Sequence, residues 1–258
     1  MTDVRIAVDR QWIGGKLLTP ETPAMRHAAV LFVHGWGGSQ RRDIAKAKQL
    51  VQAGYGCLTF NLRGHARTRR QIETVSRAQN LRDVLAAYDF LLQERALAGD
   101  GIGLVGSSYG GYLAVLLTAQ RNIRWLALRA PALYKDADFD RPKRELSLDA
   151  ALPSYRNMRL SPEENRVLTS ASRFTGDVLI VESEHDTVIP HQVIENYLHA
   201  FAVAARSVTH CVLRRADHGL SRVSFRKAYG KILEDWFKKA GGTWAEEAGG
   251  REVSVVAR

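Results

Sequence analysis

The pentapeptide Gly106–Gly110 reads Gly-Ser-Ser-Tyr-Gly, a spacing that suits nucleophilic catalysis by its central serine, Ser108. The residues before it, 101–105, are short, apolar and flanked by glycine, which indicates a buried strand. The residues after it, 109–120, carry Leu, Ala and Val at helical spacing. A G-x-S-x-G between a strand and a helix is a nucleophile elbow, a strained turn from which the serine hydroxyl projects. Side chains at the two glycines would collide with neighbouring backbone, so we expect both positions to require glycine.

A serine hydroxyl is a weak nucleophile at neutral pH, so it needs a general base and an acid that orients the base. Strand-like residues 177–181 are followed by Asp186, and strand-like residues 208–213 are followed by His218. The carboxyl ends of parallel strands meet at one edge of a sheet, where ligands bind. We therefore predict Asp186 as the acid and His218 as the base, with Glu184 as an alternative acid.

The rest of the chain supplies the elements that would hold these residues. Residues 4–8 and 11–18 predict an antiparallel hairpin, and the following residues alternate between strand and helix patterns. The expected strands are 29–33, 56–61, 101–105, 124–129, 177–182 and 207–213, and the expected helices are 40–53, 77–95, 109–120, 191–204 and 222–239. Such alternation predicts an α/β protein with a doubly wound, mostly parallel sheet.

These motifs, in this order, resemble the α/β-hydrolase family over a span from about Ala28 to Lys239. The resemblance rests on residues 33–38 (VHGWGG), 61–65 (NLRGH), the elbow, and the loops that carry Asp186 and His218. The histidine loop is similar to that of small esterases and dienelactone-hydrolase-like members. The resemblance implies an α/β-hydrolase fold with an N-terminal antiparallel hairpin. It also implies a small cap inserted at about residues 133–173, where the alternative is a long surface excursion with no contact to ligand. The pattern of residues 161–164 (SPEE) predicts a helix start within this segment.

The resemblance also implies an oxyanion hole formed by the backbone N–H groups of Trp36 and Tyr109. The same two residues are the expected substrate-binding residues, since the Trp36 side chain would form a wall of the pocket. Residues 35–39 are equally well explained as a Gly-rich turn capped by Ser39 at the start of a helix, and both interpretations can hold together. We expect His34 and His65 to organise the backbone of this edge rather than to take part in catalysis.

Length and composition fit one soluble domain. The chain has 258 residues, of which 45% are hydrophobic and 25% charged. We expect a single domain over residues 1–240 and a C-terminal tail over 241–258, with an edge strand or oligomer contact at 253–256. No run reaches the roughly 18 apolar residues of a membrane span, and the first residues lack a signal-peptide pattern. Cys57 and Cys211 read as buried core thiols, which favours a cytoplasmic location.

The formal net charge of +10 allows two interpretations. The first is a solvated basic face, and the second is a basic pocket rim that attracts an acidic substrate. The basic residues that concentrate in the chain are Arg63, Arg67, Arg69, Arg70, Arg77, Arg82, Arg141, Lys143 and Arg144. The sequence shows no nucleic-acid-binding motif, so we expect no nucleic-acid partner. A homo-oligomer is compatible with the sequence.

No cofactor or metal is expected. The chain lacks a G-x-G-x-x-G after its first strand and a Walker loop, and its eight histidines show no metal-ligand spacing. The predicted function is a serine esterase that cleaves a carboxylic ester of a small molecule through an acyl-enzyme. The alternatives are an amide or peptide hydrolase with the same residues, as in the aminopeptidases and acyl-peptide hydrolases that the chain also resembles, a non-catalytic ligand-binding protein, and acyl transfer to an acceptor other than water.

Overall fold

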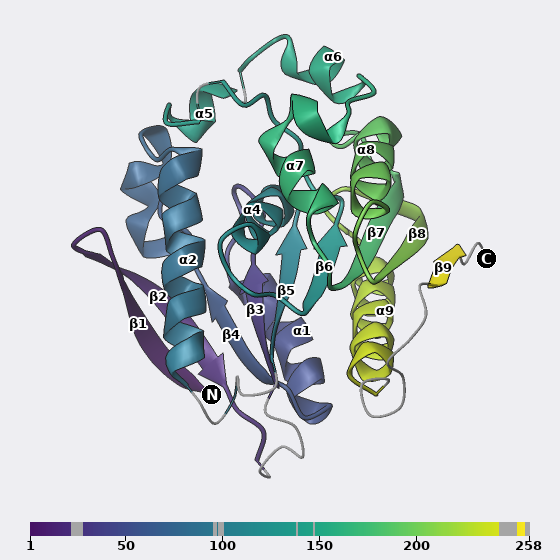
Figure 1. Ribbon diagram of the computed structural model, residues 1–258. Helices are drawn as coiled ribbons and strands as arrows, with labels where there is room; N and C mark the ends of the chain where they lie inside the picture. The colour runs from purple at the N-terminus through teal and green to yellow at the C-terminus, as the bar shows by residue number, and fades with distance from the viewer. Residues whose placement is uncertain are drawn as a thin grey trace.

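A computed structural model describes residues 1–21, 28–94, 97, 101–137, 139–146, 148–242 and 252–255. Its centre is one sheet in the order β1-β2-β4-β3-β5-β6-β7-β8-β9, parallel from β4 through β9 (Figure 1). The strands are β1 (Thr2–Val8), β2 (Gln11–Leu18), β3 (Ala28–Val33), β4 (Gly56–Phe60), β5 (Gly101–Ser107), β6 (Trp125–Arg129), β7 (Asp177–His185), β8 (Ser207–Asp217) and β9 (Glu252–Val255). The doubly wound, mostly parallel sheet predicted from the sequence is therefore confirmed.

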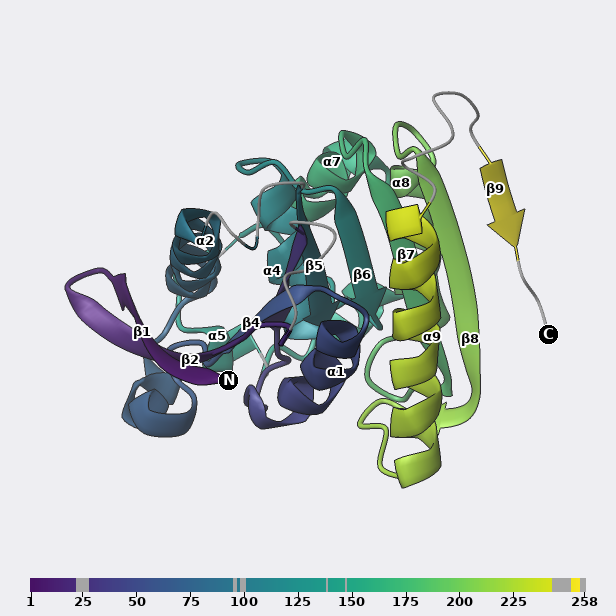
Figure 2. The ribbon, with the colours of Figure 1, turned by 90° about the horizontal axis from the view of Figure 1, so that it is seen from below.

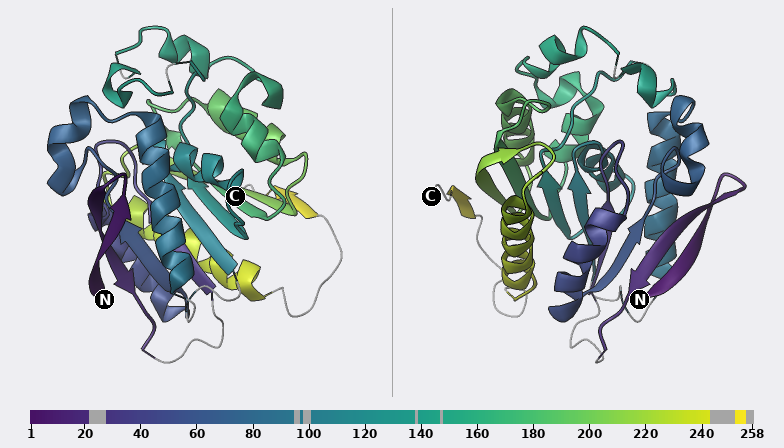
Figure 3. Two further views of the ribbon diagram at one scale, coloured as in Figure 1. Left: turned by 60° about the vertical axis from the view of Figure 1, so that its left-hand side comes forward. Right: turned by 180° about the vertical axis from the view of Figure 1, so that it is seen from behind.

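Helices cover both faces of this sheet. On one face lie α2 (Arg77–Gln93), α4 (Tyr109–Thr118), α7 (Arg166–Ser172) and α8 (His191–Phe201), and on the other lie α1 (Arg41–Gln52) and α9 (Val223–Gly242). Figure 2 shows the two layers on either side of the sheet, and the right panel of Figure 3 shows α1 and α9 in front of it. Each layer closes over its own hydrophobic cluster, one including Leu104 and Leu126 and the other including Val105 and Trp125. Successive residues of β5 and β6 thus point into opposite cores, which fixes the register of the strand that leads to Ser108.

The N-terminal hairpin has the predicted form, with β1 antiparallel to β2 and β2 antiparallel to β4. The start of α1 differs from the prediction, because the helix begins at Arg41 with Gln40, rather than Ser39, at its N-cap. Gln40 contributes no side-chain cap; its N–H donates to Asn61 Oδ1 over 3.0 Å. This bond holds the helix start against Asn61, the residue after β4, but it caps none of the N–H groups of the first turn.

The described residues between β6 and β7 form several short helices, and Figure 1 shows α5 and α6 beyond the carboxyl ends of β5 and β6. They are α5 (Lys143–Leu146), α6 (Leu152–Arg156), the 3-10 turn η2 (Pro162–Glu164) and α7. Ser161 and Glu164 form the predicted capping box at the start of η2. A second 3-10 element, η1 (Ala66–Glu73), was not anticipated and precedes α2.

The far edge of the sheet is formed by β8 and β9, which pair in parallel with Ser207 opposite Glu252. The expected edge strand at 253–256 matches β9, whereas residues 243–251 and 256–258 of the predicted tail lie outside the described residues. Cys57 and Cys211 are free thiols; Cys57 is buried, but Cys211 is only half-buried. Among the described residues, no helix is both long and apolar enough to cross a membrane.

Candidate active site

Ser108 occupies a strained turn between β5 and α4. Its φ of 51° and ψ of −115° lie in a region that non-glycine residues seldom adopt. Its N–H donates to Arg129 O over 2.9 Å, and its carbonyl accepts from Ala132 N and Tyr112 N. These backbone bonds hold the turn against β6 and the first turn of α4, so the strained conformation is fixed from three sides.

The glycines on either side of Ser108 are required by close backbone contacts. A Cβ at Gly106 would lie 2.6 Å from Gly111 Cα, and a Cβ at Gly110 would lie 2.1 Å from Val33 O and 2.5 Å from His34 O. The expected collisions are therefore present at both positions. They let α4 approach the ends of β3 and β5 closely enough to place Ser108 at the edge of the sheet.

The structure brings Ser108, His218 and Asp186 into one hydrogen-bonded chain. His218 Nε2 lies 3.1 Å from Ser108 Oγ, and His218 Nδ1 lies 2.7 Å from Asp186 Oδ2. The three residues come from the ends of β5, β7 and β8, which are the strand ends predicted to carry them. A carboxylate at Nδ1 favours the tautomer whose Nε2 accepts the hydroxyl proton.

Asp186 is held as an ionised acceptor. Its Oδ1 accepts hydrogen bonds from Val188 N (2.9 Å) and Ile189 N (2.8 Å), while Oδ2 faces His218. Burial alone would raise the pKa of Asp186, but the hydrogen bonds from His218 and these two amides outweigh it and lower the pKa. Glu184, the alternative acid, instead accepts from Arg215 N over 2.6 Å.

Trp36 follows the end of β3 by three residues, and Tyr109 directly follows Ser108. Tyr109 is the first residue of α4, a position whose N–H has no acceptor within the helix. Among the described residues, neither the Trp36 nor the Tyr109 N–H donates to another backbone or side-chain group. The Trp36 and Tyr109 rings meet edge to face at 5.4 Å, with Trp36 half-buried and Tyr109 fully buried. Trp36 is therefore the one of the two predicted substrate-binding side chains that reaches solvent.

His34 and His65 organise the loop that carries Trp36, as expected. Gly37 N donates to His65 Nε2 over 2.9 Å, and Leu62 N donates to His34 Nε2 over 3.1 Å. Burial lowers the pKa of His65 to about 4 and also lowers that of His34, so both rings remain neutral acceptors. The loop after β3 is thereby tied to the loop after β4.

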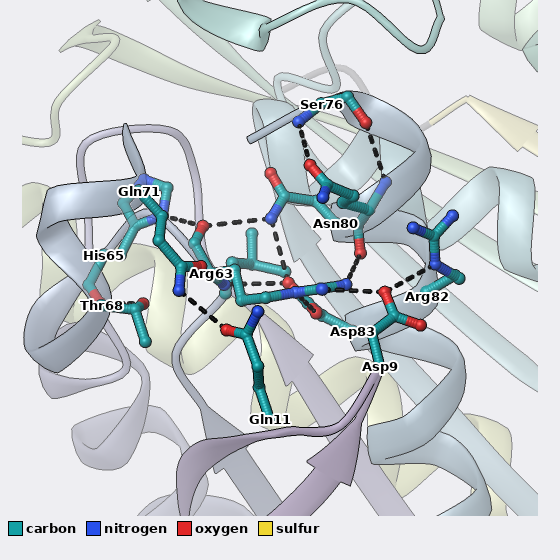
Figure 4. A network of polar contacts seen from close by, with 12 residues as sticks. Asp9, Gln11, Arg63, His65, Thr68, Gln71, Ser76, Asn80, Arg82 and Asp83 are labelled. Carbon is teal, nitrogen blue, oxygen red and sulfur yellow. Dashed lines mark hydrogen bonds and ion pairs between the residues drawn. The ribbon is translucent and has the colours of Figure 1, made fainter. Parts of the chain in front are cut away.

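A largely buried polar network joins the loop after β4 to α2 (Figure 4). Arg63 pairs with Asp83 and with Asp9, and Asn80 Nδ2 donates to Asp83 Oδ2 over 3.0 Å. Asn80 Oδ1 in turn accepts from Tyr109 Oη over 3.0 Å. Burial raises the pKa of Asp83 to about 6, although the Arg63 charge opposes the rise. The network links the residue after Ser108 to the loop after β4.

Arg63 lies neither on a solvated basic face nor on a basic pocket rim. Its side chain is 2% exposed and forms ion pairs with two carboxylates. Arg77 and Lys143, also assigned to a solvated face, are buried as well, whereas Arg67, Arg69 and Arg70 are exposed. Sequence reasoning also missed the position of Lys143, whose Nζ lies 4.6 Å from the centre of the Trp36 ring. No local signal marks that contact, because it joins residues more than a hundred positions apart in the chain.

Within the described part of the chain, no group of three or more His, Cys, Asp or Glu side chains could hold a metal ion.

This sheet, with a serine at a strained strand–helix turn, defines the class of α/β-hydrolase-fold serine hydrolases. The chain belongs to the prolyl oligopeptidase family, whose sequence profile matches residues 42–243. The protein is therefore a hydrolase of the α/β-hydrolase type, and the proteins with a similar fold include both esterases and peptidases.

Two solved structures and one further protein illustrate the variety of hydrolases to which the chain is similar. Est1E from Butyrivibrio proteoclasticus, solved with ferulic acid bound, superposes with a TM-score of 0.70 at 16% identity, over 92% of this chain and 98% of Est1E. The acylaminoacyl peptidase of Pyrococcus horikoshii gives a TM-score of 0.69 at 18% identity, over 92% of this chain and 41% of the peptidase. A probable 2-oxo-3-(5-oxofuran-2-ylidene)propanoate lactonase from Bradyrhizobium sp. is 26% identical over 161 residues, which are 62% of this chain and 56% of the lactonase. The match thus spans little more than half of that lactonase.

Proposed function

We propose that the protein is a serine esterase in which Ser108, His218 and Asp186 form the catalytic triad. The observation that carries the proposal is the continuous chain from Ser108 Oγ through His218 to Asp186 Oδ2, with contacts of 3.1 and 2.7 Å. Both distances suit proton transfer and orientation of the imidazole. The lowered pKa of Asp186 supports its role as the group that stabilises the imidazolium.

The proposed reaction proceeds in two steps. His218 Nε2 takes the hydroxyl proton as Ser108 Oγ attacks the ester carbonyl, and it then passes that proton to the leaving alcohol as the C–O bond breaks. Water, deprotonated by His218, attacks the acyl-enzyme, and Ser108 leaves with the returned proton. The Trp36 and Tyr109 N–H groups bind the oxyanion in both steps, and each donor contributes about 3 kcal/mol in comparable sites.

The segment between β6 and β7 is proposed to act as a small cap over this site. Two contacts support that role: Lys143 of α5 lies against the Trp36 ring, and Arg156 Nη1 of α6 donates to Val188 O over 3.1 Å. Val188 follows Asp186 by two residues, so the segment contacts the oxyanion side and the acid side of the site. We expect its residues to set the range of substrates.

An amide or peptide hydrolase with the same triad is the second candidate, favoured by membership of the prolyl oligopeptidase family. The positive charge near the site favours an esterase over an aminopeptidase, because an aminopeptidase would need acidic groups to bind the substrate amine. The two are separated by hydrolysis of 4-nitrophenyl esters, from acetate to decanoate, beside aminoacyl and N-acylaminoacyl 4-nitroanilides. The proposal predicts turnover of the esters, a preferred chain length, and loss of turnover in Ser108→Ala; preference for an anilide would favour the peptidase.

A further inference from the structure

Three cationic side chains are buried around the ring of Tyr134. Arg77 comes from α2, Lys143 from α5 and Arg156 from α6, and their charged groups lie 5.7, 5.0 and 5.1 Å from the centre of that ring. Their exposed fractions are 0%, 2% and 9%. We refer to Arg77, Lys143 and Arg156 as the cationic cluster. Long basic side chains usually reach water with their charged ends, so three that end inside the protein require an explanation.

The two arginines are held by neutral oxygens. Arg77 donates to Lys135 O and Ala137 O, each over 2.6 Å, and Arg156 donates to Leu133 O and Val188 O, each over 3.1 Å. Among the described residues, no carboxylate lies within 4.0 Å of either guanidinium. These bonds orient both arginines, and within the described part of the chain no anion faces their charge.

Of the described carboxylates, three that lie near the cluster are occupied by other cations. Asp83 pairs with Arg63, Asp136 with Arg166 and Asp149 with Lys135, all in contacts that turn them to other cations. Burying charge without a counter-ion is costly in a protein interior. The excess positive charge is also felt by Lys143, because burial and the charges of Arg156 and Arg77 lower its pKa to about 7.

The cationic cluster adjoins the site proposed above. Lys143 Nζ lies 4.6 Å from the Trp36 ring centre and 5.4 Å from that of Tyr109, the two residues whose amides are the proposed oxyanion donors. On the other side, Arg156 holds the carbonyl of Val188, whose N–H donates to Asp186. Trp36 is half-buried, so an anion bound next to it would approach Lys143 across that ring.

We infer that the cationic cluster binds a carboxylate of the substrate, with Lys143 as the residue that recognises it. This inference rests on the proposed function and narrows its substrate class to esters or lactones that carry a free carboxylate. The anion supplies the negative charge that the described residues do not give the two buried arginines, and the half-buried ring of Trp36 borders the carbon skeleton that connects it to the reacting carbonyl. Neutral esters of equal length would be cleaved by the same triad, but less efficiently.

The test compares matched esters with matched variants. The 4-nitrophenyl monoester of adipate and 4-nitrophenyl hexanoate differ only in whether a carboxylate or a methyl group ends the acyl chain. 3-Acetoxybenzoate and phenyl acetate form the equivalent pair on the alcohol side. Lys143→Met removes the buried charge, Lys143→Arg retains one, and Arg144→Met removes an exposed charge from the same helix, where Arg144 pairs with Glu73.

For wild type we expect kcat/KM to favour the carboxylate-bearing ester of at least one pair by about 10- to 100-fold, as a charged hydrogen bond would provide. Lys143→Met should lose that preference, so that its kcat/KM for the carboxylate-bearing ester falls to that for the neutral ester. Lys143→Arg should retain a preference, and Arg144→Met should behave as wild type. Free adipate should also inhibit wild type competitively and better than hexanoate, a measurement that needs no variant.

The outcomes separate the two proposals. If wild type cleaves none of the esters, the esterase proposal fails. If wild type cleaves the neutral esters at least as well as the carboxylate-bearing ones and adipate inhibits no better than hexanoate, the esterase proposal stands and the anion site is refuted. A loss in Lys143→Met that is equal for charged and neutral esters would make Lys143 a structural residue of the cap and would equally refute the inference.

Discussion

Adding a single methyl group at Gly110 should separate the two halves of the proposed oxyanion hole. The Cβ of an alanine there would lie 2.1 Å from Val33 O, whereas real Cβ atoms essentially never come within 3.0 Å of such a neighbour. The difference, 3.0 − 2.1 = 0.9 Å, is the least by which α4 and the end of β3 must part. Both colliding atoms, Val33 O and His34 O, belong to the backbone, so no flexible side chain can yield instead.

That movement acts directly on the site, because β3 leads to Trp36 and α4 begins at Tyr109. A misplacement of about 1 Å costs on the order of 10²-fold in rate. Overpacking of this kind also destabilises by about 1–3 kcal/mol, which for a chain of this length lowers Tm by roughly 2–12 °C. Gly110→Ala is therefore expected to remain folded at room temperature and to lose about 10²-fold in kcat/KM.

Gly111→Ala is the matched control, since it adds the same methyl group one residue further along α4. There the nearest atom is Pro131 Cβ at 3.1 Å, which requires a shift of only a few tenths of an ångström. Alanine also gains about 1 kcal/mol of helix propensity over glycine, so Gly111→Ala should stay near wild type in both kcat/KM and Tm. The assay is ester hydrolysis beside thermal melting for all three proteins. Wild-type kcat/KM in Gly110→Ala, or an equal loss in Gly111→Ala, would refute the reasoning.

Three other predictions concern side chains that hold the site and its surrounding loops in place. Asp186→Asn should lower kcat by up to about 10⁴-fold with little change in fold, because the amide no longer selects the right imidazole tautomer; steady-state kinetics beside circular dichroism test this, and retained activity would contradict it. Burial lowers the pKa of His65 to about 4. The neutral ring therefore adds to the free energy of unfolding fully above the unfolded-state pKa of about 6.5, and this contribution is lost as the pH falls toward 4. Urea unfolding should show about 2 kcal/mol of this loss by about pH 5, and in His65→Gln this contribution should be absent; an identical pH dependence in both proteins would argue against a neutral buried ring. Asp83→Asn should cost about 3–5 kcal/mol by leaving a buried guanidinium poorly compensated, whereas Asp89→Asn, at an exposed ion pair, should cost under about 1 kcal/mol; equal losses in urea unfolding would contradict the difference in burial.

Much of the fold could be predicted because its signals are local. Strands such as β5 and β6 are short apolar runs, and α2 and α8 show helical spacing, so their order along the chain indicates a parallel sheet. The same logic placed Ser108, Asp186 and His218 at one edge, since each follows a strand. The start of α1 was predicted less well, because its N-cap is Gln40 rather than Ser39, and Gln40 is held there by a tertiary contact with Asn61.

The surroundings of the site could not be predicted in the same way. Arg63 and Asp83 stand 20 residues apart, and nothing in the local sequence indicates that they meet in the interior. A basic residue at a loop is ordinarily exposed, so Lys143 was assigned to the solvated face with Arg141 and Arg144. Its burial against Trp36 depends on how the segment between β6 and β7 folds back, which is a property of the tertiary structure alone.

The central claim is that Ser108 is the nucleophile of an acyl-enzyme mechanism, and covalent labelling tests it most directly. Wild type, Ser108→Ala and Ser107→Ala would be treated with a fluorophosphonate, and their intact masses measured together with their ester turnover. We expect one adduct and turnover in wild type and in Ser107→Ala, and neither in Ser108→Ala. An adduct or wild-type turnover in Ser108→Ala would contradict the account.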